Sequence, residues 1–259
     1  MLVTPLFLFK LLFVPGIVGG IGWAGKRWNA QIAGLLSGLP VVAGPISWFL
    51  YLQYGADFAV SAAQSTLLGI SALAGFCWMY AWASQRCSWW WSLAAGWSVF
   101  LLLALGLAQL QLSLWLTLLV TLGSTLLIWN LVPQGSVVPA KIQTQPSELV
   151  YRMLFALVLV FLITCCAKTL GSTLSGLFSA FPVASSVLAV FTHRYHAKEQ
   201  VIVSMRGVLL GSFGLTTFYV LLAFLPKHIS FSHAFVIAIV LVLLTQWLLS
   251  QLRRARVGV

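Results

Sequence analysis

The chain has 259 residues, of which 61% are hydrophobic and only 7% are charged, and its formal net charge is +11. This composition excludes a soluble globular domain, because apolar runs of about 20 residues, long enough to cross roughly 30 Å of hydrocarbon, recur along the whole sequence. Basic cytoplasmic loops explain the positive charge better than nucleic-acid binding does. We therefore expect an all-α polytopic membrane protein.

Nine apolar segments are predicted to cross the membrane. They are residues 3–24, 31–53, 57–83, 88–108, 111–131, 148–168, 172–192, 199–225 and 230–251. The connection 132–147 is rich in Pro, Gly, Ser and Gln and is predicted to be a loop. The first segment holds Lys10 in its middle and lacks a small-residue cleavage site, so it does not resemble a cleaved signal peptide.

The distribution of basic residues predicts the orientation. With the N-terminus outside and the C-terminus in the cytoplasm, only Lys168 and Lys227 fall in outer loops. Ten basic residues then lie in inner loops and ends: Lys26, Arg27, Arg86, Lys141, Arg152, Arg194, Lys198, Arg253, Arg254 and Arg256. This bias follows the positive-inside rule and favours an odd number of spans.

A shift of 142 positions aligns the two halves of the chain without a gap. The coincident pairs are Lys10 with Arg152, Ser37 with Ser179, Pro40 with Pro182, Asp57 with Glu199, and Gln64 with Arg206. Five spans separate equivalent points, so the second copy enters the membrane from the opposite side. The prediction is two inverted four-helix repeats, 1–109 and 148–259, joined by region 110–147 with an unpaired helix 5 and a cytoplasmic loop.

The predicted repeat suggests why two apolar segments each contain a proline. Pro40 and Pro182 lie near mid-membrane, and each follows a serine three residues earlier, Ser37 and Ser179. A proline removes a hydrogen-bond donor and frees a carbonyl, which apolar surroundings tolerate only beside protein or a water-filled cavity. A packing kink would explain one such proline, whereas two at equivalent depth favour a shared functional feature.

Three basic residues lie within predicted spans without a deep acidic partner. Lys10, Arg152 and Arg206 either snorkel to an interface or attract an anionic guest. Asp57 and Glu199 stand at helix starts, where a helix N-terminus favours an anion. The predicted substrate-binding set is Lys10, Ser37, Pro40, Gln64, Arg152, Ser179, Pro182 and Arg206.

No motif indicates catalysis, a cofactor or a metal. Nucleotide-binding loops, zinc-protease motifs and paired catalytic carboxylates are all missing from the sequence, so we do not expect an enzyme. His193 and His196 lack a third ligand and fit a basic loop better than a metal site. The hydroxyls of Thr117, Thr121 and Thr125 form a stripe that favours contact between helices.

Each half resembles the GlpM-type small bacterial inner-membrane proteins. The resemblance rests on a basic residue in the first span (Lys10, Arg152), on the motifs "IAGLLSGLP" and "LSGLFSAFP", and on an acidic start to the third span. Those proteins are single four-helix units linked to glycerol 3-phosphate metabolism. The resemblance implies a bacterial inner-membrane protein in which two such units are fused, and it leaves the substrate open. Arg206 matches a basic residue in the third span of these proteins, whereas Gln64 departs from it.

The leading hypothesis is a secondary transporter or lipid flippase for an anionic substrate bound between the repeats. The substrate would be a phosphate- or carboxylate-bearing small molecule or a lipid. The alternative is a non-transporting membrane subunit or scaffold that docks a partner protein through small-residue stripes, and an intramembrane enzyme ranks third. The expected partners are membrane lipids and an anionic small molecule or phospholipid head group, not nucleic acid. The sequence leaves an oligomer or a partner subunit open.

The orientation is testable with reporter fusions at both ends. Nine spans and inner positive charge predict an N-terminus outside and the tail "RRARVGV" in the cytoplasm. Reporters that place the two termini on opposite sides of the membrane would agree with an odd number of spans. Termini on the same side would remove the basis of the inverted repeat.

Overall fold

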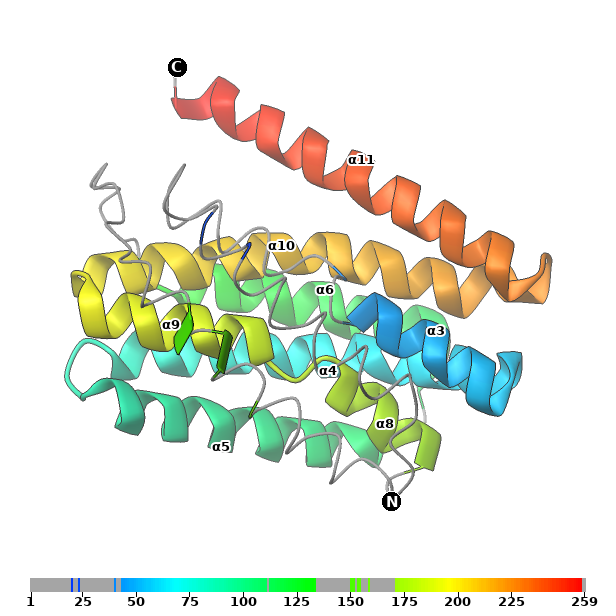
Figure 1. Ribbon diagram of the computed structural model, residues 1–259, viewed down its shortest axis with the longest axis horizontal. Coiled ribbons are helices and arrows are strands. Elements are labelled where there is room, and N and C mark those ends of the chain that lie inside the picture. The colour runs from blue at the N-terminus through cyan, green and yellow to red at the C-terminus, as the bar shows by residue number, and fades with distance from the viewer. Residues whose placement is uncertain are drawn as a thin grey trace.

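The computed structural model describes residues 43–110, 112–133 and 171–257, and the single residues 20, 23, 40, 150, 151, 153, 154 and 158. All regular elements in this part of the chain are helical (Figure 1). They are α3 (Ala43–Tyr54), α4 (Ala56–Ala83), α5 (Trp89–Ala108), α6 (Leu114–Leu131), α8 (Gly171–Ser179), α9 (Val183–Tyr195), α10 (Lys198–Phe224), the 3-10 helix η1 (Leu225–Lys227) and α11 (Phe231–Val257).

The predicted helical class is confirmed, and five predicted segments coincide with helices. These are α4, α5, α6, α10 and α11, of which α11 continues beyond the predicted end to Val257. Segments 3–24 and 148–168 lie outside the described residues except for isolated positions, and 31–53 is described only at residue 40 and from residue 43 onward. The total of nine spans therefore stays a prediction.

The helices are compatible with a protein embedded in a membrane. Five stretches of the described chain are long and apolar enough to cross one: Ala56–Ala83, Trp89–Ala108, Leu114–Leu131, Gly176–Tyr195 and Lys198–Lys227. The fourth stretch contains a break, because α8 ends at Ser179 and α9 begins at Val183. Apolar length alone would suggest one continuous helix there, and the backbone shows two.

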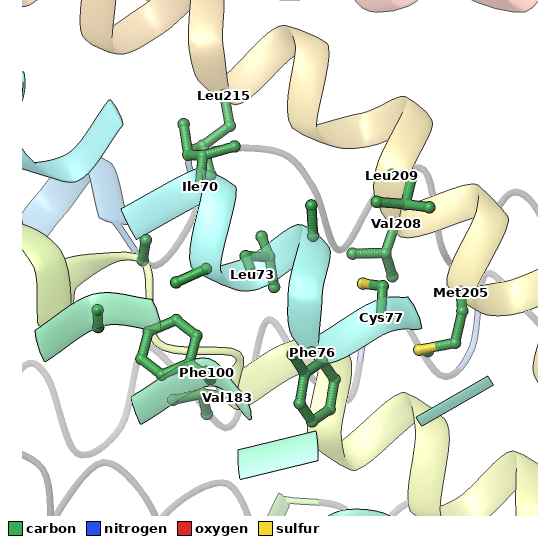
Figure 2. Packing of buried hydrophobic residues seen from close by; sticks show 14 of the residues in the cluster. Ile70, Leu73, Phe76, Cys77, Phe100, Val183, Met205, Val208, Leu209 and Leu215 are labelled. Carbon is green, nitrogen blue, oxygen red and sulfur yellow. The ribbon is translucent and has the colours of Figure 1, made fainter. Parts of the chain in front are cut away.

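Helix α4 is the centre of the packing and contacts α3, α5, α6, α8 and α10. Its buried side chains form one cluster with those of α5, α9 and α10. Figure 2 shows Ile70 of α4 and Leu215 of α10 pointing toward one another, with Phe100 of α5 below them. Such interdigitated side chains supply the dispersion contacts that hold helices together where the surrounding solvent is itself apolar.

Helices α4 and α10 run antiparallel and occupy equivalent places in the sequence. α4 begins at Ala56 and α10 at Lys198, 142 positions later, and α5 (Trp89) and α11 (Phe231) begin with the same offset. The Nζ of Lys198, at the start of α10, donates to the carbonyl of Gln85, just beyond the end of α4, at 2.7 Å. The two helices consequently point in opposite directions along their contact (Figure 1).

Contacts between the two halves are reciprocal. In the first half, α3 packs on the start of α11 through aromatic rings. The Tyr51 and Phe231 centroids lie 4.5 Å apart, and those of Trp48 and Phe235 lie 5.0 Å apart. In the second half, α9 contacts α5, where Trp97 Nε1 donates to Ser186 Oγ at 2.9 Å. Each half therefore places its second predicted span against the fourth span of the other.

Helix α6 presents a polar stripe to the protein and leucines to its surroundings. Its only buried residues are Thr117, Thr121 and Thr125, as the hydroxyl spacing predicted. Thr121 Oγ1 lies 2.8 Å from the carbonyl oxygen of Leu67 in α4. Several of its leucines, including Leu119 and Leu127, are exposed, which suits an apolar solvent rather than water.

Helix α8 approaches α4 closely through two glycines. A Cβ on Gly69 would lie 2.7 Å from the Leu177 carbonyl oxygen, and a Cβ on Gly176 would meet the Ala62 carbonyl oxygen and lie 2.8 Å from Ser65 Cβ. The obstructing atoms are largely backbone, which cannot move aside as a flexible side chain can. Small residues at these two positions therefore set the distance between the helices.

Replacing Gly176 with alanine should separate α8 from α4. The overpacked methyl group is expected to lower the free energy of unfolding by about 1–3 kcal/mol. Gly123→Ala is the matched control, because nothing lies within 4 Å of a Cβ at that position. Thermal unfolding of the two variants in detergent measures the difference, and equal stability of both would contradict the close packing.

Candidate functional site

The interruption between α8 and α9 is the most distinctive polar feature inside the apolar region. Pro182 precedes α9 with φ −74° and ψ 53° and has no N–H to continue a helix. Two carbonyls near the end of α8 accept hydrogen bonds from residues three positions later. Ala180 N donates to Leu177 O at 3.2 Å, and Phe181 N donates to Phe178 O at 3.0 Å. The next helix starts with Ser186 N donating to Pro182 O at 2.7 Å.

The carbonyl of Gly176, one turn before the break, receives a donor from another helix. Thr66 Oγ1 of α4 lies 2.8 Å from Gly176 O and 2.7 Å from Ala62 O of its own helix. Its single proton serves one of them at a time. A carbonyl without a helical partner is costly in apolar surroundings, so this contact compensates for part of the break.

Thr66 belongs to a chain of hydroxyl groups that connects four helices. Ser47 Oγ of α3 donates to Tyr219 Oη of α10 at 3.1 Å, and the Tyr219 hydroxyl lies beside Thr66 of α4. All three side chains are buried, with Tyr219 0% and Thr66 1% exposed. These hydroxyl groups link α3, which follows the turn at Pro40, to α8, which precedes the break at Pro182.

Aromatic rings of α5 cover the peptide segment between α8 and α9. Phe181 packs edge-on against Phe100 with centroids 5.2 Å apart, and Trp97 lies 5.7 Å away. Trp97 also donates its indole N–H to Ser186 Oγ in the first turn of α9. The break is therefore enclosed by protein on the sides formed by α4 and α5.

The structure describes five of the eight predicted site residues. Ser179 and Pro182 are buried at the break, and Ser179 makes an interaction within the protein. Pro40 lies in a turn ahead of α3, and its carbonyl accepts from Gly44 N at 2.6 Å. Lys10, Ser37 and Arg152 lie outside the described residues, and their roles stay predictions.

Gln64 and Arg206, which the 142-position shift aligns, contact opposite ends of α6. Gln64 Nε2 donates to the carbonyl of Leu112, just before the helix, at 2.7 Å. Arg206 Nη1 donates to the carbonyls of Val132 (2.8 Å) and Pro133 (3.3 Å), just after the helix. Leu112 and Val132 are 20 positions apart, which is about 30 Å along a helix.

These positions do not bring Gln64 and Arg206 into one site. Each side chain contacts its own end of α6, and the predicted role of either residue in substrate binding stays a prediction. Gln64 also projects from the side of α4 opposite Thr66, since two residues turn a helix by about 200°. The two residues, 142 positions apart, make similar contacts with opposite ends of one helix.

Sequence reasoning missed the hydroxyl chain of Ser47, Thr66 and Tyr219. Single hydroxyl-bearing residues are frequent in apolar helices, and none of the three is a repeat-equivalent pair with another. The available signal was a threonine and a tyrosine within long apolar helices, which is too common to single them out. Only the packing of four helices brings them together.

The described residues contain no group of three or more His, Cys, Asp or Glu side chains able to hold a metal ion. Asp57 and Glu199 are exposed in the first turns of α4 and α10, as their helix-start positions predicted. Carboxylates in these places do not form a pair that could exchange protons with a substrate. The site can bind and orient polar groups through hydroxyl and backbone atoms.

Comparison with protein families, with characterised proteins and with solved structures gave no match to the chain.

Removing the Thr66 hydroxyl tests its contact with the broken helix. Thr66→Val keeps the shape and leaves Gly176 O without its donor, so we expect a loss of about 1–3 kcal/mol in the free energy of unfolding. Thr245→Val is the matched control, because the Thr245 hydroxyl reaches only the Leu241 carbonyl of its own helix. Equal unfolding curves for both variants would show that the contact is not stabilising.

Proposed function

We propose that the chain is a membrane transporter or lipid flippase for an anionic substrate, built from two inverted repeats. The observation that carries the proposal is the antiparallel packing of α4 and α10, two helices that begin 142 positions apart in a chain whose halves align at the same offset. Inverted repeats with interrupted helices recur in secondary transporters, where the interruptions form the substrate site near mid-membrane.

Two further arrangements support an axis of pseudo-symmetry in the membrane plane. The reciprocal contacts of α3 with α11 and of α9 with α5 exchange under a half-turn. The contacts of Gln64 and Arg206 with the two ends of α6 exchange as well, which supports an axis near the middle of that helix. The unpaired helix α6 would then be the element on which both repeats are centred.

The substrate site in this proposal lies at the interruptions, not along α6. Lys10 and Arg152 supply positive charge, Ser37 and Ser179 supply hydroxyl groups, and the backbone near Pro40 and Pro182 supplies further polar groups. An anion would be held by charge-assisted hydrogen bonds. The hydroxyl groups of Ser47, Tyr219 and Thr66 connect α3 with α8, the helix that ends at the break, so a movement of one would be transmitted to the other.

Flux into liposomes tests the proposal with two defined probes. Purified protein is reconstituted, and uptake of radiolabelled glycerol 3-phosphate is measured beside transbilayer movement of a fluorescent phosphatidylglycerol. We expect flux of one probe to depend on the protein. Lys10→Gln or Arg152→Gln should lower it about ten- to a hundredfold, because one charge-assisted contact contributes about 1.5–3 kcal/mol.

Lys227→Gln is the matched control for charge removal. Lys227 lies in η1, in the predicted outer connection between α10 and α11, and the variant should transport at the unmodified rate. Unchanged flux in both Lys10→Gln and Arg152→Gln would contradict the anion site. No protein-dependent flux of either probe, from protein that remains folded, would favour the alternative of a membrane subunit that docks a partner.

A further inference from the structure

We propose that Arg206, Trp129 and the C-terminal end of α6 form a binding site for the phosphate group of an anionic phospholipid. This site is separate from the proposed transport site. It lies at the end of α6 rather than at the interrupted helices, and it requires no movement of substrate across the membrane. It would hold a lipid of the leaflet that faces the cytoplasm in the predicted orientation.

The position of Arg206 relative to α6 places its guanidinium at the level of lipid head groups. The 18 residues of the largely apolar helix α6 span about 27 Å, close to the thickness of the hydrocarbon layer. Arg206 contacts the carbonyls of Val132 and Pro133, where the chain has just left this apolar helix. Although Arg206 is nine residues into α10, its charged group is at the membrane boundary that α6 defines.

The guanidinium is held in a fixed orientation with one edge unoccupied. Nη1 donates to both carbonyls, and the guanidinium carbon lies 4.3 Å from the centre of the Trp129 ring. Within the described chain, these contacts leave the Nε and Nη2 donors without a bond. Those donors form the planar fork that binds two phosphate oxygens at once.

The charge of Arg206 is only partly compensated by the protein. The C-terminal carbonyls of α6 carry partial negative charge, and the Trp129 ring adds a cation–π contact. Glu199 lies seven residues earlier on the same face of α10, nearer the helix start, but no ion pair joins it to Arg206 among the described residues. Lys198, near the start of the same helix, adds positive potential, which attracts anionic lipids.

The surroundings favour a lipid over free phosphate. Leu126, Leu127 and Leu131 in the last turns of α6 are each at least half exposed. In a bilayer these side chains contact acyl chains that begin at the level of Arg206. A phospholipid would thus satisfy the guanidinium fork with its phosphate and the leucine surface with its chains, whereas inorganic phosphate would use only the first.

Native mass spectrometry of the detergent-purified full chain tests the site. The protein is titrated with phosphatidylglycerol and with a diacylglycerol that has the same acyl chains but no phosphate. We expect phosphatidylglycerol to bind and Arg206→Gln to weaken that binding about tenfold or more, the usual effect of losing a charge-assisted contact. Diacylglycerol should bind weakly and equally to both proteins.

Two further variants distinguish the effect of the planar guanidinium from the effects of positive charge and of misfolding. Arg206→Lys keeps the charge without the planar fork and should bind phosphatidylglycerol at an intermediate level, which also provides a measurement if Arg206→Gln fails to fold. Arg194→Gln removes one exposed positive charge at the same end of the bundle and should change binding less than twofold, within ordinary surface effects. Equal binding by the unmodified protein and both Arg206 variants would overturn the proposal.

Competition by inorganic phosphate distinguishes the two sources of a phosphate group. We expect phosphatidylglycerol to stay bound in a large molar excess of inorganic phosphate, because the acyl-chain contacts are absent from the competitor. Displacement at equal concentrations would overturn the lipid assignment and indicate a site for free phosphate. Because this readout involves no flux, it stands or fails independently of the transport proposal.

Discussion

The arrangement of the described helices depends on the need to pair backbone polar groups where no water is present. A helix that stops at Ser179 and resumes at Val183 leaves carbonyls without helical partners. Thr66 supplies a donor to Gly176 O, and it can reach that atom because Gly69 and Gly176 let α8 and α4 approach closely. The break, the threonine and the two glycines therefore form one interdependent unit.

The same constraint explains the unusual polarity of α6. In an apolar solvent leucine gains nothing by turning inward, whereas small threonine side chains let two helices approach closely, so the buried face of α6 is its hydroxyl face. Thr121 also hydrogen-bonds to the Leu67 carbonyl, whereas the hydroxyls of Thr117, Thr125 and, in α4, Ser71 have no hydrogen-bond partner among the described residues. The interface between α4 and α6 is thus held by few hydrogen bonds along its length, together with the contact of Gln64 at one end of α6.

Helices α4, α5, α6, α10 and α11 could be predicted from the sequence because long apolar runs between polar loops specify membrane helices well. The break in 172–192 was also foreseeable from Pro182, since proline cannot donate the hydrogen bond that a continuous helix needs. The threonine stripe of α6 was correctly interpreted as a contact between helices, because its spacing matches the helical period.

The contacts of the candidate site were less accessible to sequence reasoning. Arg206 was expected to serve a substrate because its charge lies within an apolar run, but its depth depends on where α6 ends, and the sequence does not give the offset between two helices. The hydroxyl chain through Tyr219 depends on the packing of four helices distant in sequence. A sequence shows how far a residue lies from the start of its own helix. It does not show how far one helix is shifted along its axis relative to a neighbouring helix.

The central claim is that the two halves of the chain lie in opposite orientations, and labelling of two loops tests it most directly. Cys87, between α4 and α5, is exposed, and His228, between α10 and α11, is its counterpart one residue short of the 142-position offset. In a chain with Cys77, Cys165 and Cys166 replaced by serine, a membrane-impermeant maleimide is applied to intact and opened cells. The account predicts that the cysteine of His228→Cys reacts in intact cells, and that Cys87, tested in a separate variant, reacts only after the cells are opened. Reaction of both from the same side would contradict the inverted arrangement.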